Sequence, residues 1–317
     1  MKAVFLDLKS LDCDDLQLTD LQSQFDSFEG FAETAPEQVA GRIVDADVVI
    51  VNKVVLDAAL LQQAKQLKLI CIAATGTNNV DLVKAAELNI KVANCQAYGT
   101  ASVAQHVLTL MLALHTNLIA YNTAARNGQW AQAKQFCLLD YPIQELEGKT
   151  LGLVGYGNLG AGVARLAEAF GMKVLIAQRG DKVVEGRLPL AQLLPQVDVL
   201  TLHCPLTDDT RNLIDSAALA LMKPGSFLVN AARGGIVNET DLAQALKSGH
   251  LAGAATDVLT VEPPVQGNPL LADDIPNLIV TPHSAWGSVQ ARQRIVAQMT
   301  ESIAGFKRNE MIRMVVS

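Results

Sequence analysis

The feature that most constrains this chain is a glycine-rich turn between an apolar stretch and a helical pattern. Residues 151–154 (LGLV) lead into 155–160 (GYGNLG), and 161–170 continue with helical spacing. The first glycine of such a turn permits a tight bend, the second lets a pyrophosphate approach the backbone, and the third lets helix and strand pack closely. The helix then presents unpaired N–H groups and its positive dipole end to the anion. The order strand, turn, helix predicts a dinucleotide-binding domain.

Strand and helix patterns alternate on both sides of this turn. Before it, we expect strands at 3–7, 48–51, 69–73 and 91–94 and helices at 57–66 and 81–88. From the turn onward, we expect strands at 150–155, 173–177, 198–203, 226–231, 251–257 and 278–281, with helices ending at 170 and spanning 239–248. Such alternation indicates parallel sheets covered by helices, which is an α/β fold.

A long apolar helix is expected from residue 99 or 100 to about residue 125. Ser102 and Gln105 have the spacing of a capping box. The apolar positions recur at steps of three and four residues, so they form one stripe: Val103, Val107, Leu110, Met111, Leu114 and Leu118. The stripe fits core packing and fits equally well a helix that helps to form a homodimer, and the two interpretations are compatible.

The last helical pattern spans 289–306 and has few residues after it. The strand before it, 278–281, already belongs to the second predicted sheet. We therefore expect this helix to pack back on the first domain. The predicted architecture is two doubly wound parallel-sheet domains. A Rossmann domain, 100–285, is inserted into a flavodoxin-like domain formed by residues 1–99 and 286–317.

Composition limits the classes of partner. Half of the 317 residues are hydrophobic, which indicates a globular chain, and the net charge of −7 disfavours nucleic acid and anionic membranes. The apolar stretch 107–120 is too short to span a bilayer, and the N-terminus lacks the apolar run of a signal peptide. Five scattered cysteines without a CxxC pair predict neither disulfides nor a metal site, and they suit the cytoplasm: Cys13, Cys71, Cys95, Cys137 and Cys204.

Three residues that could carry chemistry each follow a different predicted strand. Arg233 follows the strand 226–231, and its guanidinium fork suits a carboxylate. Glu262 comes after the strand 251–257, and His283 comes after 278–281. Because ligands bind at the carboxyl ends of strands in open α/β sheets, these side chains could converge on one cleft. A bound nicotinamide would suggest hydride transfer with His283 as proton carrier and Glu262 favouring its imidazolium. We interpret the other histidines as structural: His106, His115, His203 and His250.

Five motifs occur in a characteristic order over nearly the whole chain: 155–160 (GYGNLG), 204–207 (CPLT), 230–235 (NAARGG), 257–263 (DVLTVEP) and 282–286 (PHSAW). As a set, they resemble the D-isomer-specific 2-hydroxyacid dehydrogenase family. The stretch 73–81 (AATGTNNVD) and Trp286 resemble its glycerate dehydrogenase/hydroxypyruvate reductase branch most.

The resemblance implies a reversible reductase of small 2-keto acids such as hydroxypyruvate or glyoxylate. It implies that Arg233 holds the substrate, that His283 protonates the carbonyl oxygen, and that Glu262 sustains the charge of His283. Substrate contacts are expected at Lys53, Thr75, Gly76, Arg233 and Trp286, of which Thr75 and Gly76 come from the other domain. Asp257 is expected to bind the carboxamide of the nicotinamide. Cofactor contacts are expected at Gly155, Gly157, Asn158, Leu159, Gly160, Gln178, Arg179, Cys204, Pro205, Thr210, Ala231, Ala232, Asp257, His283 and Ala285.

The sequence leaves the choice between NAD and NADP open. NAD-binding members of the family have an acidic residue at the end of the second strand, whereas this chain has Gln178-Arg179. A neutral amide does not repel a 2′-phosphate, and Arg179 could attract one. The alternative from another class is a cofactor-sensing interaction protein, because C-terminal-binding corepressors share the fold. Formate dehydrogenase is disfavoured, because the residue that pairs with its histidine is glutamine and this chain has Glu262. Phosphoglycerate dehydrogenase is disfavoured, because a substrate phosphate needs several basic groups and the loop 52–55 (NKVV) offers only Lys53.

Overall fold

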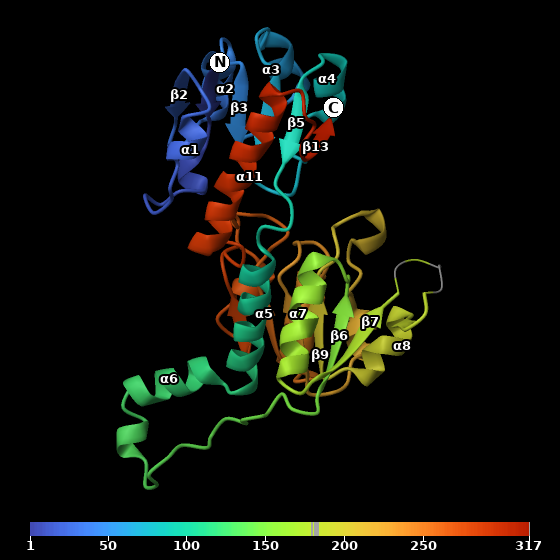
Figure 1. Cartoon of the computed structure of the whole chain (residues 1–317). Helices are drawn as coiled ribbons and strands as arrows, with labels where there is room; N and C mark the ends of the chain where they lie inside the picture. Colours follow the sequence, from blue (N-terminus) through green and yellow to red (C-terminus); the bar gives the residue numbers. More distant parts are fainter. Residues whose placement is uncertain (179, 181–183, 317) are drawn as a thin grey trace. The chain divides into compact units, whose positions relative to one another are not determined.

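The computed structural model describes residues 1–178, 180 and 184–316, which form two compact units (Figure 1). Unit 1 comprises Met1–Gly99 and Gly287–Ser317, and unit 2 comprises Thr100–Trp286. Unit 2 is therefore inserted into the chain of unit 1. Trp286, which we expected to open the returning segment, groups with unit 2 because it packs against that unit's core.

Unit 1 contains a six-stranded sheet with the order β13-β5-β4-β3-β1-β2. Its first five strands follow the doubly wound order 2-1-3-4-5, all parallel, and β13 is added antiparallel to β5. The strands are β1 (Lys2–Phe5), β2 (Ser27–Gly30), β3 (Val48–Val51), β4 (Leu69–Ile72), β5 (Lys91–Asn94) and β13 (Met314–Val316). Every residue of β3 and β4 is buried, as expected of parallel strands covered on both faces.

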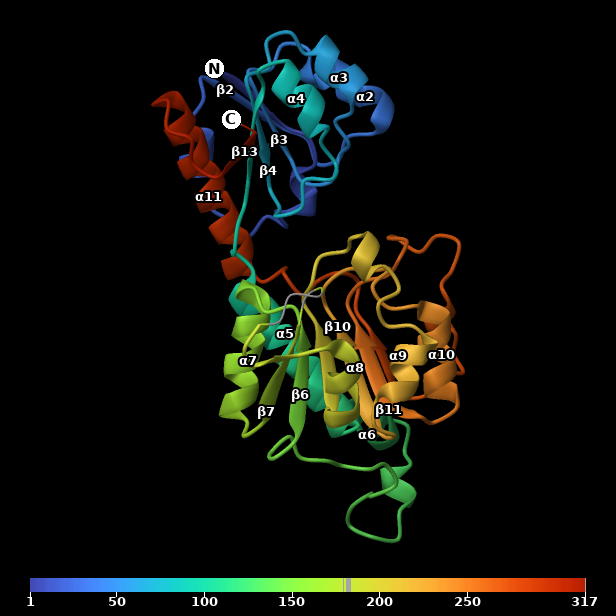
Figure 2. The same ribbon diagram turned by 90° about the vertical axis from the view of Figure 1, so that its right-hand side faces the viewer.

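Helices cover both faces of this sheet, with α2, α3 and α4 on one side and α11 on the other (Figure 2). The helices of unit 1 are α1 (Thr19–Gln22), α2 (Pro36–Ile43), α3 (Ala58–Gln63), α4 (Leu82–Glu87) and α11 (Val289–Lys307). Arg292 ties α11 to the N-terminal part of the unit, because its guanidinium donates to both carboxylate oxygens of Asp15 at 2.7 and 2.6 Å and to the Leu11 carbonyl at 3.0 Å.

Unit 2 contains a seven-stranded parallel sheet with the order β12-β11-β10-β9-β6-β7-β8. Counted from β6, this is the Rossmann order extended by one strand. The strands are β6 (Thr150–Val154), β7 (Lys173–Ala177), β8 (Arg187–Leu188), β9 (Val199–Leu202), β10 (Ser226–Asn230), β11 (Leu251–Thr256) and β12 (Leu278–Val280). The expected α/β class, with a Rossmann and a flavodoxin-like sheet, is confirmed.

Two apolar clusters fill the two faces of the second sheet. Figure 2 shows α5 and α7 on one face and α8, α9 and α10 on the other. The helices of unit 2 are α5 (Thr100–His115), α6 (Leu118–Arg126), α7 (Asn158–Ala169), α8 (Leu190–Leu193), α9 (Ser216–Leu221) and α10 (Glu239–Lys247). The apolar stripe of α5 is buried up to Leu114, so this part of the stripe packs in the core.

The single helix expected from residue 100 to 125 is wrong. Asn117 adopts a left-handed conformation, with φ of 49°, and the axes of α5 and α6 differ by 61°. Asparagine tolerates this conformation better than most residues, because its short polar side chain can form local hydrogen bonds. Leu118 is therefore turned out of the stripe and is 59% exposed.

The expected capping box at Ser102 and Gln105 is also wrong. The helix already begins at Thr100, so Ser102 lies within its first turn, and its hydroxyl donates to the carbonyl of Ala285 at 2.7 Å. Among the described residues, no single helix is long and apolar enough to cross a membrane. The bent pair of α5 and α6 meets that test only by length and composition.

Two glycines of the turn after β6 give a test of the fold. A Cβ on Gly160 would lie 2.2 Å from the carbonyl oxygen of Gly155, whereas a Cβ on Gly157 would meet no heavy atom within 4 Å. We expect Gly160→Ala to lower the free energy of unfolding by roughly 3 kcal/mol, the upper end of the usual cost of overpacking. Gly157→Ala should cost less than about 1 kcal/mol. Urea unfolding of both variants measures the difference, and equal stabilities would contradict the close packing of α7 on the turn that follows β6.

Candidate active site

The glycine turn forms a cradle at the end of β6. Gly155 has φ of +100°, which is a conformation that glycine adopts without strain, and a Cβ there would lie 2.6 Å from the backbone of His203 and Cys204. Gly157 is the N-cap of α7, and the space beside it is open. The turn thus presents bare backbone and the N-terminus of a twelve-residue helix, an arrangement that suits a pyrophosphate.

The second strand of unit 2, β7, ends at Ala177, and Gln178 follows it. The side-chain amide of Gln178 donates to the carbonyl of Gly180 at 2.9 Å. Its carboxamide is therefore held next to the strand end, where the choice between ribose hydroxyls and a 2′-phosphate is made in this type of domain. Arg179, the second residue of this prediction, lies outside the described residues.

The carboxyl ends of β9 and β10 continue the same edge of the sheet of unit 2, the edge at which its parallel strands end. Cys204 and Pro205 follow β9, and the Thr210 hydroxyl closes this loop by donating to the Pro205 carbonyl at 2.7 Å. Ala231 and Ala232 follow β10 and are nearly buried. The two alanines carry no side-chain atom beyond Cβ.

His203 directly follows β9, and its contacts are in keeping with the structural role expected for it. Its Nε2 is 3.0 Å from the hydroxyl of Thr201, and its buried Nδ1 has no partner among the described residues. Burial lowers the pKa of His203 to about 4, because a charged imidazole is costly away from water. The ring is therefore neutral at physiological pH and supplies no charge to the cofactor side of the edge.

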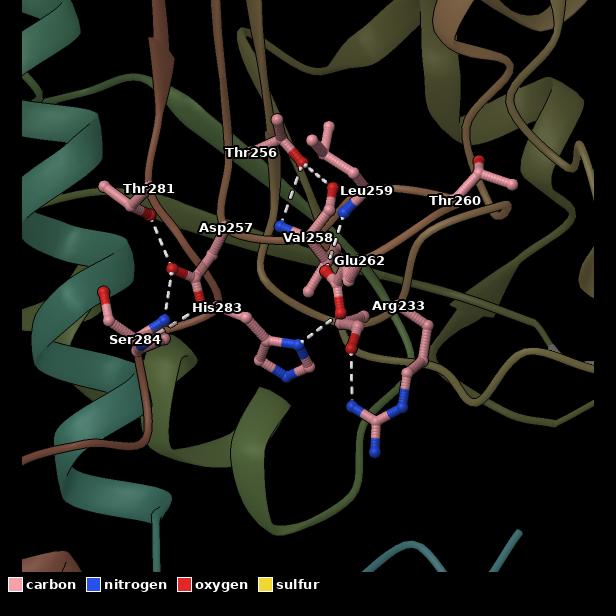
Figure 3. A network of polar contacts seen from close by, with 12 residues as sticks. Arg233, Thr256, Asp257, Val258, Leu259, Thr260, Glu262, Thr281, His283 and Ser284 are labelled. Atoms are coloured by element: carbon pink, nitrogen blue, oxygen red, sulfur yellow. Dashed lines mark hydrogen bonds and ion pairs between the residues drawn. The ribbon is translucent and has the colours of Figure 1, made fainter. Parts of the chain in front are cut away.

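Arg233 is the third residue after the buried strand β10 and is exposed. One guanidinium nitrogen donates to the carbonyl of Ala232 at 2.7 Å. This bond orients the side chain and, among the described residues, occupies one of its five donors. In the view of Figure 3, the guanidinium and the His283 ring point the same way.

Glu262 and His283 are joined by a hydrogen bond. Nδ1 of His283 lies 2.7 Å from one carboxylate oxygen of Glu262, and the Leu259 N–H donates to the other at 2.8 Å (Figure 3). The side chains of His283 and Glu262 are 30% and 35% exposed, so the pair is accessible from solvent. Since Nδ1 is engaged with Glu262, Nε2 is the ring nitrogen through which His283 can exchange a proton with a ligand.

Asp257 holds the loop that carries His283. The His283 N–H donates to the Asp257 carbonyl at 2.7 Å, and the N–H groups of Ser284 and Ala285 donate to its two carboxylate oxygens, both at 2.9 Å. Asp257 is only 1% exposed. A buried carboxylate with this many donors fixes the backbone around it, so Asp257 has a structural role beside the one expected at the cofactor.

Three other predicted substrate residues, Lys53, Thr75 and Gly76, lie in unit 1, whereas Trp286 is the last residue of unit 2. Lys53 is exposed, and its backbone N–H donates to buried Asp7 at 2.6 Å. Thr75, next to Gly76, donates its hydroxyl to the Cys95 carbonyl at 2.8 Å. These residues follow β3 and β4, at the carboxyl edge of the sheet of unit 1.

Within unit 2, the structure brings the predicted catalytic residues to one edge. Arg233, Glu262 and His283 follow β10, β11 and β12, which are consecutive neighbours in the sheet. Sequence reasoning missed Thr281 and treated His106 as unconnected with this edge, although both contact Asp257. A threonine at a strand end and a histidine in an apolar helix carry no specific motif, so only a structure could join them.

Comparison with known proteins agrees with this geometry. Residues 108–285 match the family described as D-isomer specific 2-hydroxyacid dehydrogenase, NAD binding domain. A glycerate dehydrogenase of Methylorubrum extorquens is 43% identical over 305 residues, with 96% of each chain covered. A hydroxypyruvate reductase of Blautia hydrogenotrophica is 34% identical, with 99% of each chain covered. The crystal structure of the TT0316 protein from Thermus thermophilus superposes with a TM-score of 0.88 at 32% identity over all of both chains.

These matches confirm the predicted family and the resemblance to its glycerate dehydrogenase/hydroxypyruvate reductase branch. They also confirm a nicotinamide cofactor, and none of them favours the interaction-protein alternative. This chain is an oxidoreductase that belongs to the D-isomer-specific 2-hydroxyacid dehydrogenase family.

Proposed function

We propose that this chain reduces hydroxypyruvate or glyoxylate to D-glycerate or glycolate and catalyses the reverse oxidation. The observation that carries the proposal is the 2.7 Å pair of Glu262 and His283, accessible at the same sheet edge as Arg233. The names of the glycerate dehydrogenase and hydroxypyruvate reductase relatives support the substrate class.

Arg233 would bind the substrate carboxylate. The bond to Ala232 orients the guanidinium, and within the part of the chain that the structure describes its other donors remain for a bidentate contact with a planar carboxylate. Lys53, Thr75, Gly76 and Trp286 are proposed as further substrate contacts, on the resemblance of their motifs.

His283 would exchange the proton of the reaction. In reduction, its Nε2–H protonates the carbonyl oxygen, and the neutral ring then regains a proton from solvent. In oxidation, neutral Nε2 takes the hydroxyl proton. Glu262 stabilises the imidazolium electrostatically and fixes the ring through Nδ1. The bound nicotinamide supplies or accepts the hydride at the substrate C2.

The cofactor would lie along the edge that begins at the glycine turn. The open space at Gly157 and the N-terminus of α7 fit its pyrophosphate. We propose contacts at Gly155, Gly157, Asn158, Leu159, Gly160, Gln178, Arg179, Cys204, Pro205, Thr210, Ala231, Ala232, Asp257, His283 and Ala285. NADP is admissible beside NAD, because no acidic side chain stands at position 178.

We further propose a homodimer and a cytoplasmic location. The segment that follows α5 extends away from the sheet of unit 2 (Figure 1) and exposes large apolar side chains. Phe136 is 90% exposed and Leu139 is 76% exposed. Apolar groups gathered on one exposed segment are typical of a protein interface, and a second copy of this chain would cover them.

The direct test of the function is a panel of 2-keto acids assayed with NADH and with NADPH. We expect hydroxypyruvate or glyoxylate to have the highest kcat/KM. Arg233→Lys should lower that value by about 10- to 100-fold, because lysine cannot reproduce a bidentate charge-assisted contact. Arg165→Lys, an exposed arginine on α7, is the matched control. Full activity of Arg233→Lys would remove Arg233 from the site.

The Glu262–His283 pair predicts a loss of activity that depends on one charge. Reduction requires the imidazolium, which the Glu262 carboxylate stabilises across the 2.7 Å contact with Nδ1. In Glu262→Gln, which keeps the shape and removes the charge, kcat/KM for reduction at pH 7 should fall by about tenfold or more, because a hydrogen bond to a charged group contributes roughly 1.5–3 kcal/mol. Steady-state rates of the parent and the variant measure the loss. Full activity of Glu262→Gln, while His283→Ala is inactive, would assign the stabilising charge to another group.

Position 178 should control the choice of cofactor. In Gln178→Asp, the carboxylate can accept bonds from the ribose hydroxyls and repel a 2′-phosphate. The ratio of KM for NADPH to KM for NADH should rise by about tenfold or more, as a charged group adds roughly 1.5–3 kcal/mol to such contacts. Gln178→Asn, which stays neutral, is the control. An unchanged ratio in Gln178→Asp would exclude this side chain from the cofactor site.

A further inference from the structure

His283 has a backbone conformation that must be imposed by its surroundings. Its φ of 53° lies in the left-handed region, which residues with a Cβ seldom adopt. The His283 N–H donates to the carbonyls of Asp257 at 2.7 Å and Thr281 at 3.0 Å, and the next two N–H groups, of Ser284 and Ala285, donate to the Asp257 carboxylate. The conformation of the loop that carries His283 therefore depends in part on what holds the Asp257 carboxylate in place.

Thr281 is the side chain that holds this carboxylate. Its Oγ1 lies 2.5 Å from Oδ1 of Asp257 (Figure 3). Because an ionised carboxylate only accepts hydrogen bonds, the threonine hydroxyl must be the donor. Thr281 directly follows β12, so the bond connects the end of that strand with the end of β11.

His106 in turn orients the Thr281 hydroxyl. Nε2 of His106, in the middle of α5, lies 3.1 Å from Oγ1 of Thr281 and 3.5 Å from Oδ1 of Asp257. Since the only hydrogen of the hydroxyl is directed to Asp257, the ring must donate Nε2–H to the threonine oxygen. The three side chains form a directed chain of donors from a core helix to the loop that carries His283.

We infer that Thr281 and His106 are positioning residues for the acid–base histidine. This inference rests on the proposed function, because it assigns them the task of holding His283 through Asp257. Neither residue needs to contact the substrate. Their effect is on the orientation of the imidazole, and small displacements of a catalytic group reduce the rate of the chemical step strongly.

Paired variants separate the hydrogen bonds from packing. Thr281→Val removes the hydroxyl at nearly constant shape, and we expect kcat for keto-acid reduction to fall by about tenfold, with KM changed by less than about threefold. Thr281→Ser restores the donor and should restore kcat. His106→Met should lower kcat by about threefold, whereas His106→Gln, which keeps an N–H donor, should stay near the parent.

A double variant tests whether the two residues act through one chain. If His106 acts only through the Thr281 hydroxyl, Thr281→Val with His106→Met should lose no more than Thr281→Val alone, about tenfold. A product of the two losses, about thirtyfold, would overturn the directed chain. Unchanged kcat in Thr281→Val, or failure of Thr281→Ser to restore it, would overturn the positioning role. If Thr281→Val does not fold, the kcat values of His106→Met and His106→Gln still test the positioning role, because His106 is only half-buried.

Amide hydrogen exchange tests the chain without any substrate. In Thr281→Val, the amides of Ser284 and Ala285 should exchange at least about tenfold faster, with those of β10 unchanged as the internal control. Unchanged exchange at both amides would overturn the inference. If the variants change amide exchange as expected but the unsubstituted protein reduces no 2-keto acid, the proposed function is refuted and the hydrogen-bonded chain of His106, Thr281 and Asp257 is still supported.

Discussion

The buried carboxylate of Asp257 is the group on which the geometry of the site depends. A charge that is 1% exposed would be costly without partners, and here the partners are the backbone and side chains of the loop that carries chemistry. The cost of burial thus becomes a constraint: the loop must adopt the conformation that satisfies the carboxylate. That conformation places His283 against Glu262 at 2.7 Å.

The parallel sheet of unit 2 explains why these groups meet. Parallel strands direct all their carboxyl ends to one edge, and β10, β11 and β12 are neighbours there. Arg233, Glu262 and His283 lie far apart in sequence, but each needs only a short loop to reach that edge. The glycine turn after β6 opens at the carboxyl edge of the same sheet, so a dinucleotide and the acid–base pair are presented by one rigid element.

Much of this was predictable because strands and motifs carry strong local signals. The fully buried strands β3 and β4 appear in the sequence as continuous apolar runs, and the glycine turn follows from its spacing. The break at Asn117 was not predictable, since the apolar stripe continues to Leu118 and only tertiary structure turns that residue outward. The short, largely exposed β2 gave no periodic signal either. The contacts of His106 and Thr281 join residues 175 positions apart, and single-sequence patterns contain no information about such pairs.

The reaction proposed at this edge is the transfer of a hydride from a bound reduced nicotinamide to the C2 carbon of a 2-keto acid. The most direct measurement is reduction of hydroxypyruvate with a reduced nicotinamide cofactor deuterated at C4, followed by mass spectrometry and chiral chromatography of the product. Of the two cofactor forms that carry deuterium on one or the other face of C4, one should give D-glycerate with one deuterium at C2. His283→Ala should give no deuterated D-glycerate over the same time. Product without deuterium from either cofactor face, or glycerate of the L configuration, would contradict it.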